Sequence, residues 1–136
     1  MTESADGVLF TDGTDSVLFH PPVAYPDGPG FRQRVDIISG PFRGSIDASS
    51  YAGPGALADF HQQLQAVYES LKGEATLPRC YEDIRMSIKG DGMGHVAVCG
   101  EVMAGRTMAV RLNFSFGLDQ THLPQIIKSL ERFFSQ

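Results

Sequence analysis

The second half of the chain, residues 84–134, constrains the fold more than any other part of the sequence. Three runs of alternating apolar and polar residues, 84–89, 95–103 and 108–116, precede a segment whose apolar residues recur at three- and four-residue steps. Alternation with a period of two is typical of strands that bury one face, and it favours antiparallel pairing. The pattern of residues 123–134 predicts an amphipathic helix. We therefore expect three antiparallel strands and a C-terminal helix, with Asp119 or Thr121 as its cap.

The first half of the chain predicts a similar arrangement. Residues 8–11 and 16–19 flank Asp12-Gly13, a pair that favours a tight hairpin turn. Residues 31–37 and 42–48 alternate around Ser39-Gly40-Pro41, and Phe42 falls on the same face as the apolar residues of its strand. The stripe of apolar residues in 57–71 predicts a helix of about five turns that ends near Gly73.

These elements predict an α+β domain. Two apolar helix faces and one apolar sheet face can bury one another, so we expect a single antiparallel sheet with two helices packed on one face, in the order ββββ-α-βββ-α. A chain of 136 residues is most simply one domain. Within 1–136, residues 1–30 are predicted to be an acidic hairpin with a Pro/Gly-rich arm, and residues 31–136 to be the α+β core.

The two cysteines are predicted to be free thiols. A hairpin around Gly90-Asp91-Gly92-Met93 places Met86 near Val98 and Cys99 near residue 85. Cys80 then lies about 16 Å further along the ladder. A disulfide requires Cα atoms within about 7 Å, so Cys80 and Cys99 should not be bridged.

The net charge of −5 is unevenly distributed. Residues 1–30 contain five acidic and no basic side chains, while residues 31–136 contain 11 of each sign. A nucleic-acid-binding protein would instead show a basic stripe, so we predict no nucleic-acid partner. The acidic segment can serve solubility alone, or it can steer the approach of a basic partner.

Patterns that carry chemistry are weak in this sequence. Gly90-Asp91-Gly92-Met93-Gly94 resembles a phosphate-binding loop, but a strand rather than a helix follows it, which favours a hairpin turn. The four histidines are not paired with other metal ligands at a useful spacing, and no nucleophile motif occurs. We therefore predict no catalytic residues, no metal site and no cofactor.

The polar face of the predicted sheet is a candidate binding surface. A three-residue loop at 105–107 would set Glu101 opposite Arg111, and Arg85 lies on the same face, which Arg32, Arg34 and Arg43 could share. Such a face can be a solvated surface with cross-strand ion pairs. The alternative is a flat protein-binding surface, where arginine is enriched.

Two segments of the second half resemble a known family. The run Met93-Gly94-His95-Val96-Ala97-Val98 and the helix start Asp119-Gln120-Thr121-His122-Leu123 are similar to a family of small bacterial proteins that overlaps the WapI-type immunity proteins. The resemblance covers roughly residues 31–134 in the order of strands and helices. It implies a cytoplasmic protein that binds a protein partner, for which a secreted toxin that it neutralises is the candidate, and it implies no enzyme activity.

The resemblance and the charge pattern together lead to two hypotheses. In the first, the chain is a protein-binding module, and the candidate contact residues are Asp12, Asp15 and Asp27, with Arg85 and Arg111 as an alternative surface. An acidic arm could occupy the basic substrate cleft of a nuclease-type toxin. In the second, the chain is a small-ligand-binding or enzymatic domain with a pocket between the helices and the sheet.

Location and assembly are less constrained by the sequence. Residues 1–10 carry Glu3 and Asp6 where a secretory signal would carry Lys or Arg, and no run of about 18 apolar residues occurs. We therefore expect a cytoplasmic protein with no membrane partner. The sequence leaves a monomer and a homodimer equally open.

Overall fold

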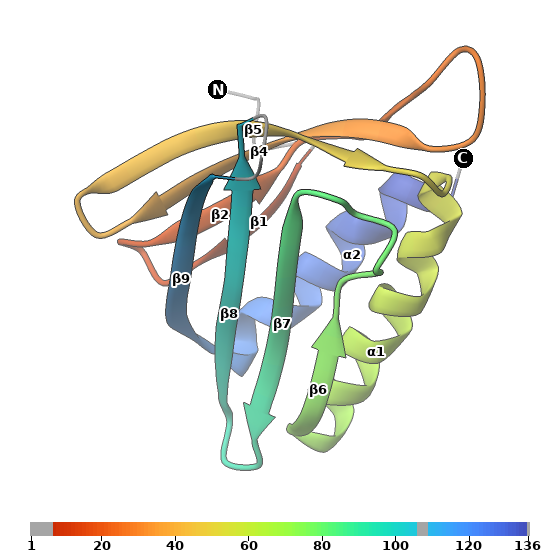
Figure 1. Ribbon diagram of the computed structural model, residues 1–136. Coiled ribbons are helices and arrows are strands. Elements are labelled where there is room, and N and C mark those ends of the chain that lie inside the picture. The colour runs from red at the N-terminus through yellow and green to blue at the C-terminus, as the bar shows by residue number, and fades with distance from the viewer. Residues whose placement is uncertain (1–6, 106–108, 136) are drawn as a thin grey trace.

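The computed structural model describes residues 7–105 and 109–135, which form two antiparallel sheets and two helices (Figure 1). The first sheet contains β1 (Val8–Thr11), β2 (Ser16–Phe19), β3 (Val23–Ala24), β4 (Phe31–Ser39) and β5 (Phe42–Ser50). The second sheet contains β6 (Lys72–Thr76), β7 (Ile84–Asp91), β8 (His95–Ala104) and β9 (Val110–Asp119). The predicted α+β class with antiparallel strands is confirmed.

The prediction of a single sheet is wrong. The first sheet runs β1-β2-β4-β3 with β5 on the other side of β4, and the second runs β6-β7-β8-β9. The two sheets meet where the end of β5 approaches the segment before β7, through an isolated bridge between Ser50 and Tyr81. Ser49 adds two bonds there, from the Glu82 amide at 2.9 Å and to the Asp83 carboxylate at 2.8 Å. The bridge is isolated, so no continuous ladder joins the two sheets.

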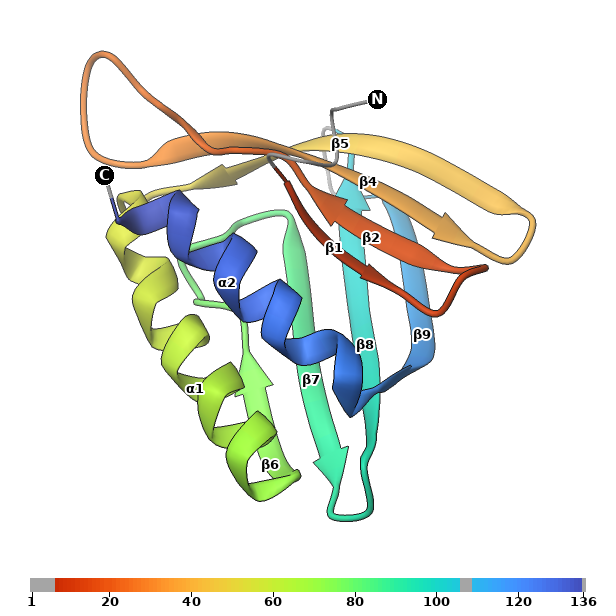
Figure 2. The same ribbon diagram turned by 180° about the vertical axis from the view of Figure 1, so that it is seen from behind.

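Both helices lie on the same side of the second sheet (Figures 1 and 2). Helix α1 (Leu57–Ser70) follows a 3-10 turn, η2 (Pro54–Ala56), and packs on β6, while α2 (Leu123–Phe134) follows η3 (Gln120–His122) and packs on α1 and β1. Helix α1 ends at Leu71, whose φ of 62° is left-handed. The helix therefore ends shortly before Gly73, near which its end was predicted. Within the described residues, neither helix is long and apolar enough to cross a membrane.

The predicted side-chain cap of the last helix is wrong. His122 occupies the cap position of α2, and no side chain caps this helix or η3 in the described part of the chain. The 3-10 turn at Gln120–His122 instead leads directly into the helix, with Pro124 in its first turn, where a missing amide donor costs nothing.

One apolar core lies between the sheets and the helices, and the first hairpin belongs to it. Val8 and Phe10 of β1 and Val17 and Phe19 of β2 are buried in the same cluster as the residues of β4, the second sheet and both helices. The rings of Phe10 and Phe19 contact edge to face, with centroids 6.1 Å apart. The acidic residues of this region therefore sit on turns and loops attached to a buried hairpin.

The register of the second sheet differs from the prediction by two residues. Met86 pairs with Gly100, and Val98 pairs with Ile88. The strands run further toward the turn than expected, because Gly92 and Gly94 both take positive φ and close it tightly. A shift of two residues keeps every side chain on its predicted face. Cys99 therefore lies opposite Ser87, on the exposed face.

The two cysteines are both free, as predicted. Cys80 is buried between the two sheets, where the Ser50 hydroxyl donates to its sulfur at 3.1 Å, and Cys99 is exposed on the outer face of β8. The distance along the ladder between the two residues explains why no disulfide forms.

Gly100 makes room for the aromatic ring of Phe114. The two residues are directly opposite on β8 and β9, and a Cβ atom on Gly100 would lie 2.4 Å from Phe114 Cζ and 2.6 Å from the Arg85 carbonyl oxygen. Phe114 is buried, as its place in the alternation predicts, because its ring lies across the glycine. The close approach therefore requires glycine at position 100.

A chain of buried polar groups joins the first sheet to the loop before β7. The Tyr81 hydroxyl donates to Gln33 Oε1, and Gln33 Nε2 donates to the His20 carbonyl oxygen at 2.7 Å. Burial raises the pKa of Tyr81 strongly, and the neighbouring Cys80 acts in the same direction. The phenol therefore stays protonated and serves as a hydrogen-bond donor.

Candidate functional site

An apolar groove of about 450 Å³ lies where the β4–β5 hairpin projects past the edge of the second sheet (Figure 1). One wall comes from the hairpin and the other from the end of β8 and the start of β9. Its large apolar lining residues are Ile37, Phe42, Ile46, Val102, Val110 and Leu112.

The groove exists because a strand face continues beyond the layer that covers it. Phe42 and Ile46 have the same strand parity as the buried Ala48, so they face the side on which the core lies. The second sheet ends before it reaches Phe42, whereas Ile46 is partly buried against the core. Phe42 and Val110 are each 63% exposed, although both are large apolar residues. Paired exposed apolar residues across a groove are typical of a protein-binding surface.

An arginine lines each wall of this groove. Arg43 is exposed beside Phe42, and Arg111 lies beside Val110. Arg111 forms an ion pair with Glu101, with the guanidinium Nη1 3.3 Å from Glu101 Oε2. The predicted pair is thus present, although Glu101 is directly opposite Asn113 and reaches Arg111 diagonally. Arg106 and Thr107 of the predicted connecting loop lie outside the described residues.

The β1–β2 turn supplies negative charge next to the β4–β5 turn. The Asp12 carboxylate accepts hydrogen bonds from the amides of Thr14 at 2.8 Å and Asp15 at 2.7 Å. These two bonds lower the pKa of Asp12, so it remains ionised well into the acid range. The Asp15 carboxylate accepts a bond from the Gly40 amide at 3.0 Å. This bond ties the acidic turn to the hairpin that carries Phe42.

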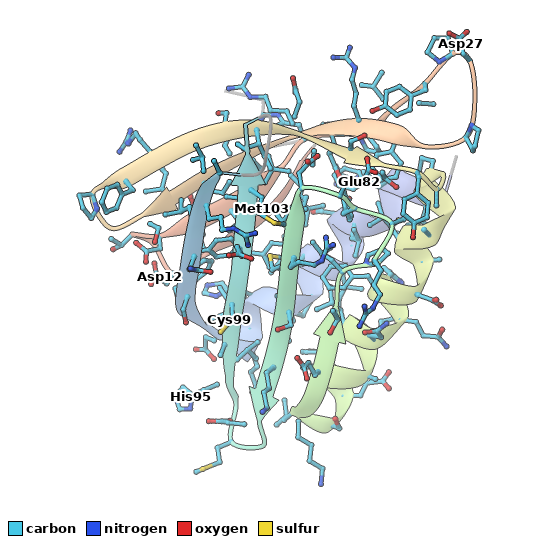
Figure 3. All side chains as sticks on the ribbon, viewed as in Figure 1. Asp12, Asp27, Glu82, His95, Cys99 and Met103 are labelled. Carbon is cyan, nitrogen blue, oxygen red and sulfur yellow. The ribbon has the colours of Figure 1, made fainter. Side chains whose placement is uncertain are left out.

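Asp27 does not share this surface. It lies at the tip of the loop between β3 and β4, at the opposite end of the first sheet from Asp12 (Figure 3). The three aspartates that the sequence suggested as contacts are therefore divided, with Asp12 and Asp15 at one end and Asp27 at the other.

Arg85 lies on the outer face of the second sheet, as predicted, but it serves the fold. Its guanidinium Nη1 donates to the carbonyl oxygens of Tyr81 at 2.7 Å and Ile84 at 3.1 Å, which holds the loop before β7. It borders a shallow hollow of about 310 Å³ whose charged lining also includes Glu74 and Glu101. Arg32, Arg34 and Arg43 belong to the first sheet and do not share this face.

A second polar cluster lies on the outer face of the first sheet around Asp36. Its carboxylate accepts from His20 Nε2 at 2.7 Å, Arg34 Nε at 3.0 Å and the Ser45 hydroxyl at 2.5 Å. Burial by itself would raise the pKa of Asp36, but the bonds from Ser45, His20 and Arg34 outweigh it and lower the pKa. All three bonds are made within the first sheet, so the cluster joins β4 to β5 and to the residue that follows β2.

The described residues do not assemble a metal site, since they contain no group of three or more His, Cys, Asp and Glu side chains that could hold an ion. His61 is buried between the helices, with its Nε2 3.9 Å from the Glu131 carboxylate. The cavity inside the core beside Phe60, Leu77 and Tyr81 measures about 10 Å³, which is room for about one water molecule. Its size does not favour a small-ligand pocket at that place.

Sequence reasoning missed Phe42 and Val110 as surface residues. Alternation predicted that Phe42 and Ile46 point toward the core side of the sheet, and they do. The alternation of apolar and polar residues does not tell whether another layer of the protein covers the end of the hairpin. The position of Phe42 directly after the Gly40-Pro41 turn, at the end of a long hairpin, was the available signal.

Comparison with known proteins identifies the family. The model of the immunity protein WapI-like family matches residues 19–136, which includes every element from β3 onward and leaves β1 outside the match. A comparison with curated protein sequences finds no match. The family resemblance expected for residues 31–134 is confirmed and extends slightly further in both directions. The chain belongs to the immunity protein WapI-like family.

Proposed function

We propose that this protein neutralises a toxin by binding it, and that the apolar groove between the β4–β5 hairpin and β9 is the contact surface. Family membership supports the general role of an immunity protein. The single observation that carries the choice of surface is the exposure of Phe42 at the groove. An aromatic side chain beside an arginine, at the edge of an apolar groove, has the composition of an interface hot spot.

The acidic turn beside the groove suggests how the partner is recognised. Asp12 is held ionised by two backbone amides, and Asp15 is fixed to the neighbouring hairpin. A toxin with a basic substrate cleft, such as a nuclease-type toxin, would be attracted to this end of the molecule. The arginines on the other side would pair with acidic residues at the rim of the partner. This activity belongs in the cytoplasm of the bacterium that makes the toxin.

Phe42→Ala should weaken toxin binding by at least about 2 kcal/mol, or roughly thirtyfold in Kd. The side chain is mostly exposed in the free protein, so the free energy of unfolding should change by less than about 0.5 kcal/mol. Calorimetric titration with the partner that co-purifies from the native host, for which the product of an upstream toxin-like gene is the first candidate, measures the effect.

A matched control is available for this experiment. Tyr51 is also aromatic and is 64% exposed, but it does not line the groove. Tyr51→Ala should leave the Kd unchanged within about twofold, which corresponds to 0.4 kcal/mol or less. Equal losses for the two variants, or no loss for Phe42→Ala, would place the interface elsewhere.

Asp12→Asn combined with Asp15→Asn should slow association with the toxin several-fold at low salt and flatten its dependence on ionic strength. Asparagine retains the oxygen that accepts the turn and Gly40 hydrogen bonds, so the local structure is kept. Stopped-flow measurements at several salt concentrations provide the rates. Asp27→Asn, at the far end of the sheet, is the control and should change neither quantity.

A salt dependence that is the same in the double variant and the wild type would assign the acidic turn to solubility alone. If the wild-type protein neither binds the co-purified candidate nor suppresses its toxic activity, the proposed function itself fails.

A further inference from the structure

Strand β1 is the border of the first sheet. In the sheet order β1-β2-β4-β3, it pairs with β2 and, among the described strands, with no other. Every second residue of a border strand directs its amide and carbonyl away from the sheet. These peptide groups must bind water or another chain.

Two backbone hydrogen bonds determine which residues of β1 direct their peptide groups outward. The Asp12 amide donates to the Asp15 carbonyl oxygen, and the His20 amide donates to the Arg34 carbonyl oxygen. Hydrogen-bonded pairs recur at every second residue of an antiparallel ladder, so both bonds assign the pairs Phe10–Val17 and Val8–Phe19 to the β1–β2 ladder. The peptide groups of Leu9 and Thr11 therefore point to the free edge.

A groove of about 310 Å³ runs along this free edge. Leu9 and Thr11 line one side of it, and His122, Gln125 and Ser129 line the other. His122 is the cap residue of α2, and Gln125 and Ser129 follow on the same face of that helix. Helix α2 passes beside β1 (Figure 2). No Asp, Glu, Lys or Arg is among the lining residues of this groove. Its walls are therefore hydroxyl, amide, imidazole and aliphatic groups.

The edge of β1 also lacks the usual protection against strand addition. Border strands of monomeric proteins commonly carry charged residues or proline. The outward positions of β5 and β9 fit this rule, since they include Arg43, Asp47 and Arg111. Strand β1 reads Val-Leu-Phe-Thr and contains neither a charge nor a proline.

We propose that the groove between β1 and α2 accepts an extended, uncharged segment of a partner protein, which adds to the first sheet as a further strand. The amides and carbonyls of Leu9 and Thr11 pair with the main chain of that segment. Its side chains alternate between the hydroxyl and amide groups of α2 and the solvent. This site shares no lining residue with the apolar groove between the β4–β5 hairpin and β9, so it does not depend on the proposed toxin contact.

The inference can be tested with a short uncharged peptide, acetyl-Thr-Val-Thr-Val-Thr-Val-Thr-amide, added to the full-length ¹⁵N-labelled protein. At saturation, hydrogen exchange of the Leu9 and Thr11 amides should slow by about tenfold or more. The amides of Val8 and Phe10 are already bonded to β2 and should change little. The same peptide with every backbone nitrogen methylated cannot donate to the edge and should have no effect.

A pair of variants tests the main-chain contact. Leu9→Pro removes the outward amide without removing a β1–β2 bond, and it should weaken peptide binding by about tenfold. Leu9→Val keeps that amide and should bind within about twofold of the wild type. If Leu9→Pro does not fold, the exchange measurement on the wild-type protein remains decisive.

Three results would overturn the inference. The first is an absence of slowed exchange at Leu9 and Thr11 up to about 5 mM peptide, where a Kd of about 1 mM gives mostly bound protein. The second is equal protection by the methylated peptide. The third is protection of Leu9 and Thr11 that rises with protein concentration in the absence of peptide, since a second copy of the chain would then occupy the edge.

Discussion

Phe10→Ala should lower the free energy of unfolding by about 3–5 kcal/mol, the usual cost of removing a fully buried phenylalanine ring. Phe10 is completely inaccessible to solvent and contacts the Phe19 ring. It also borders the small cavity beside Tyr81, Leu130 and Phe133, so truncation would enlarge an existing void. A loss of this size is a large share of the stability of a small domain.

Urea unfolding followed by circular dichroism measures this change, and Leu9→Ala is the control. Leu9 is the neighbouring residue on the opposite face of β1 and is 39% exposed, so its truncation should cost clearly less. The comparison tests whether the first hairpin belongs to the core. If Phe10→Ala and Leu9→Ala both cost less than about 0.5 kcal/mol, the hairpin is a dispensable arm.

Phe114→Ala should also destabilise the protein by about 3–5 kcal/mol. The ring is buried across Gly100, in a row with Met86 on the inner face of the second sheet. Removing it uncovers the glycine and leaves a cavity in the core. Thermal and urea unfolding measure the change, and Asn113→Ala, on the exposed face of the same strand, should be nearly neutral.

Gly100→Ala provides an independent check of the same contact. Its Cβ atom would overlap both the Phe114 ring and the Arg85 carbonyl oxygen, so the substitution should cost about 1–3 kcal/mol. The combination with Phe114→Ala should cost less than the sum of the two single variants, because part of the overlap is with the ring. Strict additivity would show that the two residues do not touch.

Most strands and both helices were predictable from the sequence, although β3 and β6 were not predicted. Alternation identified the strands at 84–91, 95–104 and most of 110–119, and the apolar stripes identified both helices. These elements follow from short-range periodicity, since a strand repeats every two residues and a helix every 3.6. Strand β6 was missed because only Ala75 of its five residues is buried, so it has no alternation to detect.

The candidate site was only partly predictable. The pairing of Arg111 with Glu101 and the exposed position of Arg85 were expected from strand parity. The division of Asp12 and Asp15 from Asp27 was not, because their spacing along the chain does not tell where a proline-rich loop carries the last of them. The exposure of Phe42 depends on where the second sheet ends.

The sequence by itself therefore determined the class of fold, the direction in which the residues of the predicted strands point, and the free state of Cys80 and Cys99. Only the tertiary structure decided that the strands divide into two sheets, that β1 forms a border beside α2, and that a groove opens beyond β9. The physical reason is range. The direction of a side chain follows from its neighbours along the chain. The partners of a strand and the uncovered part of a face depend on contacts between residues far apart in sequence, and several pairings of the same strands would bury the same apolar faces.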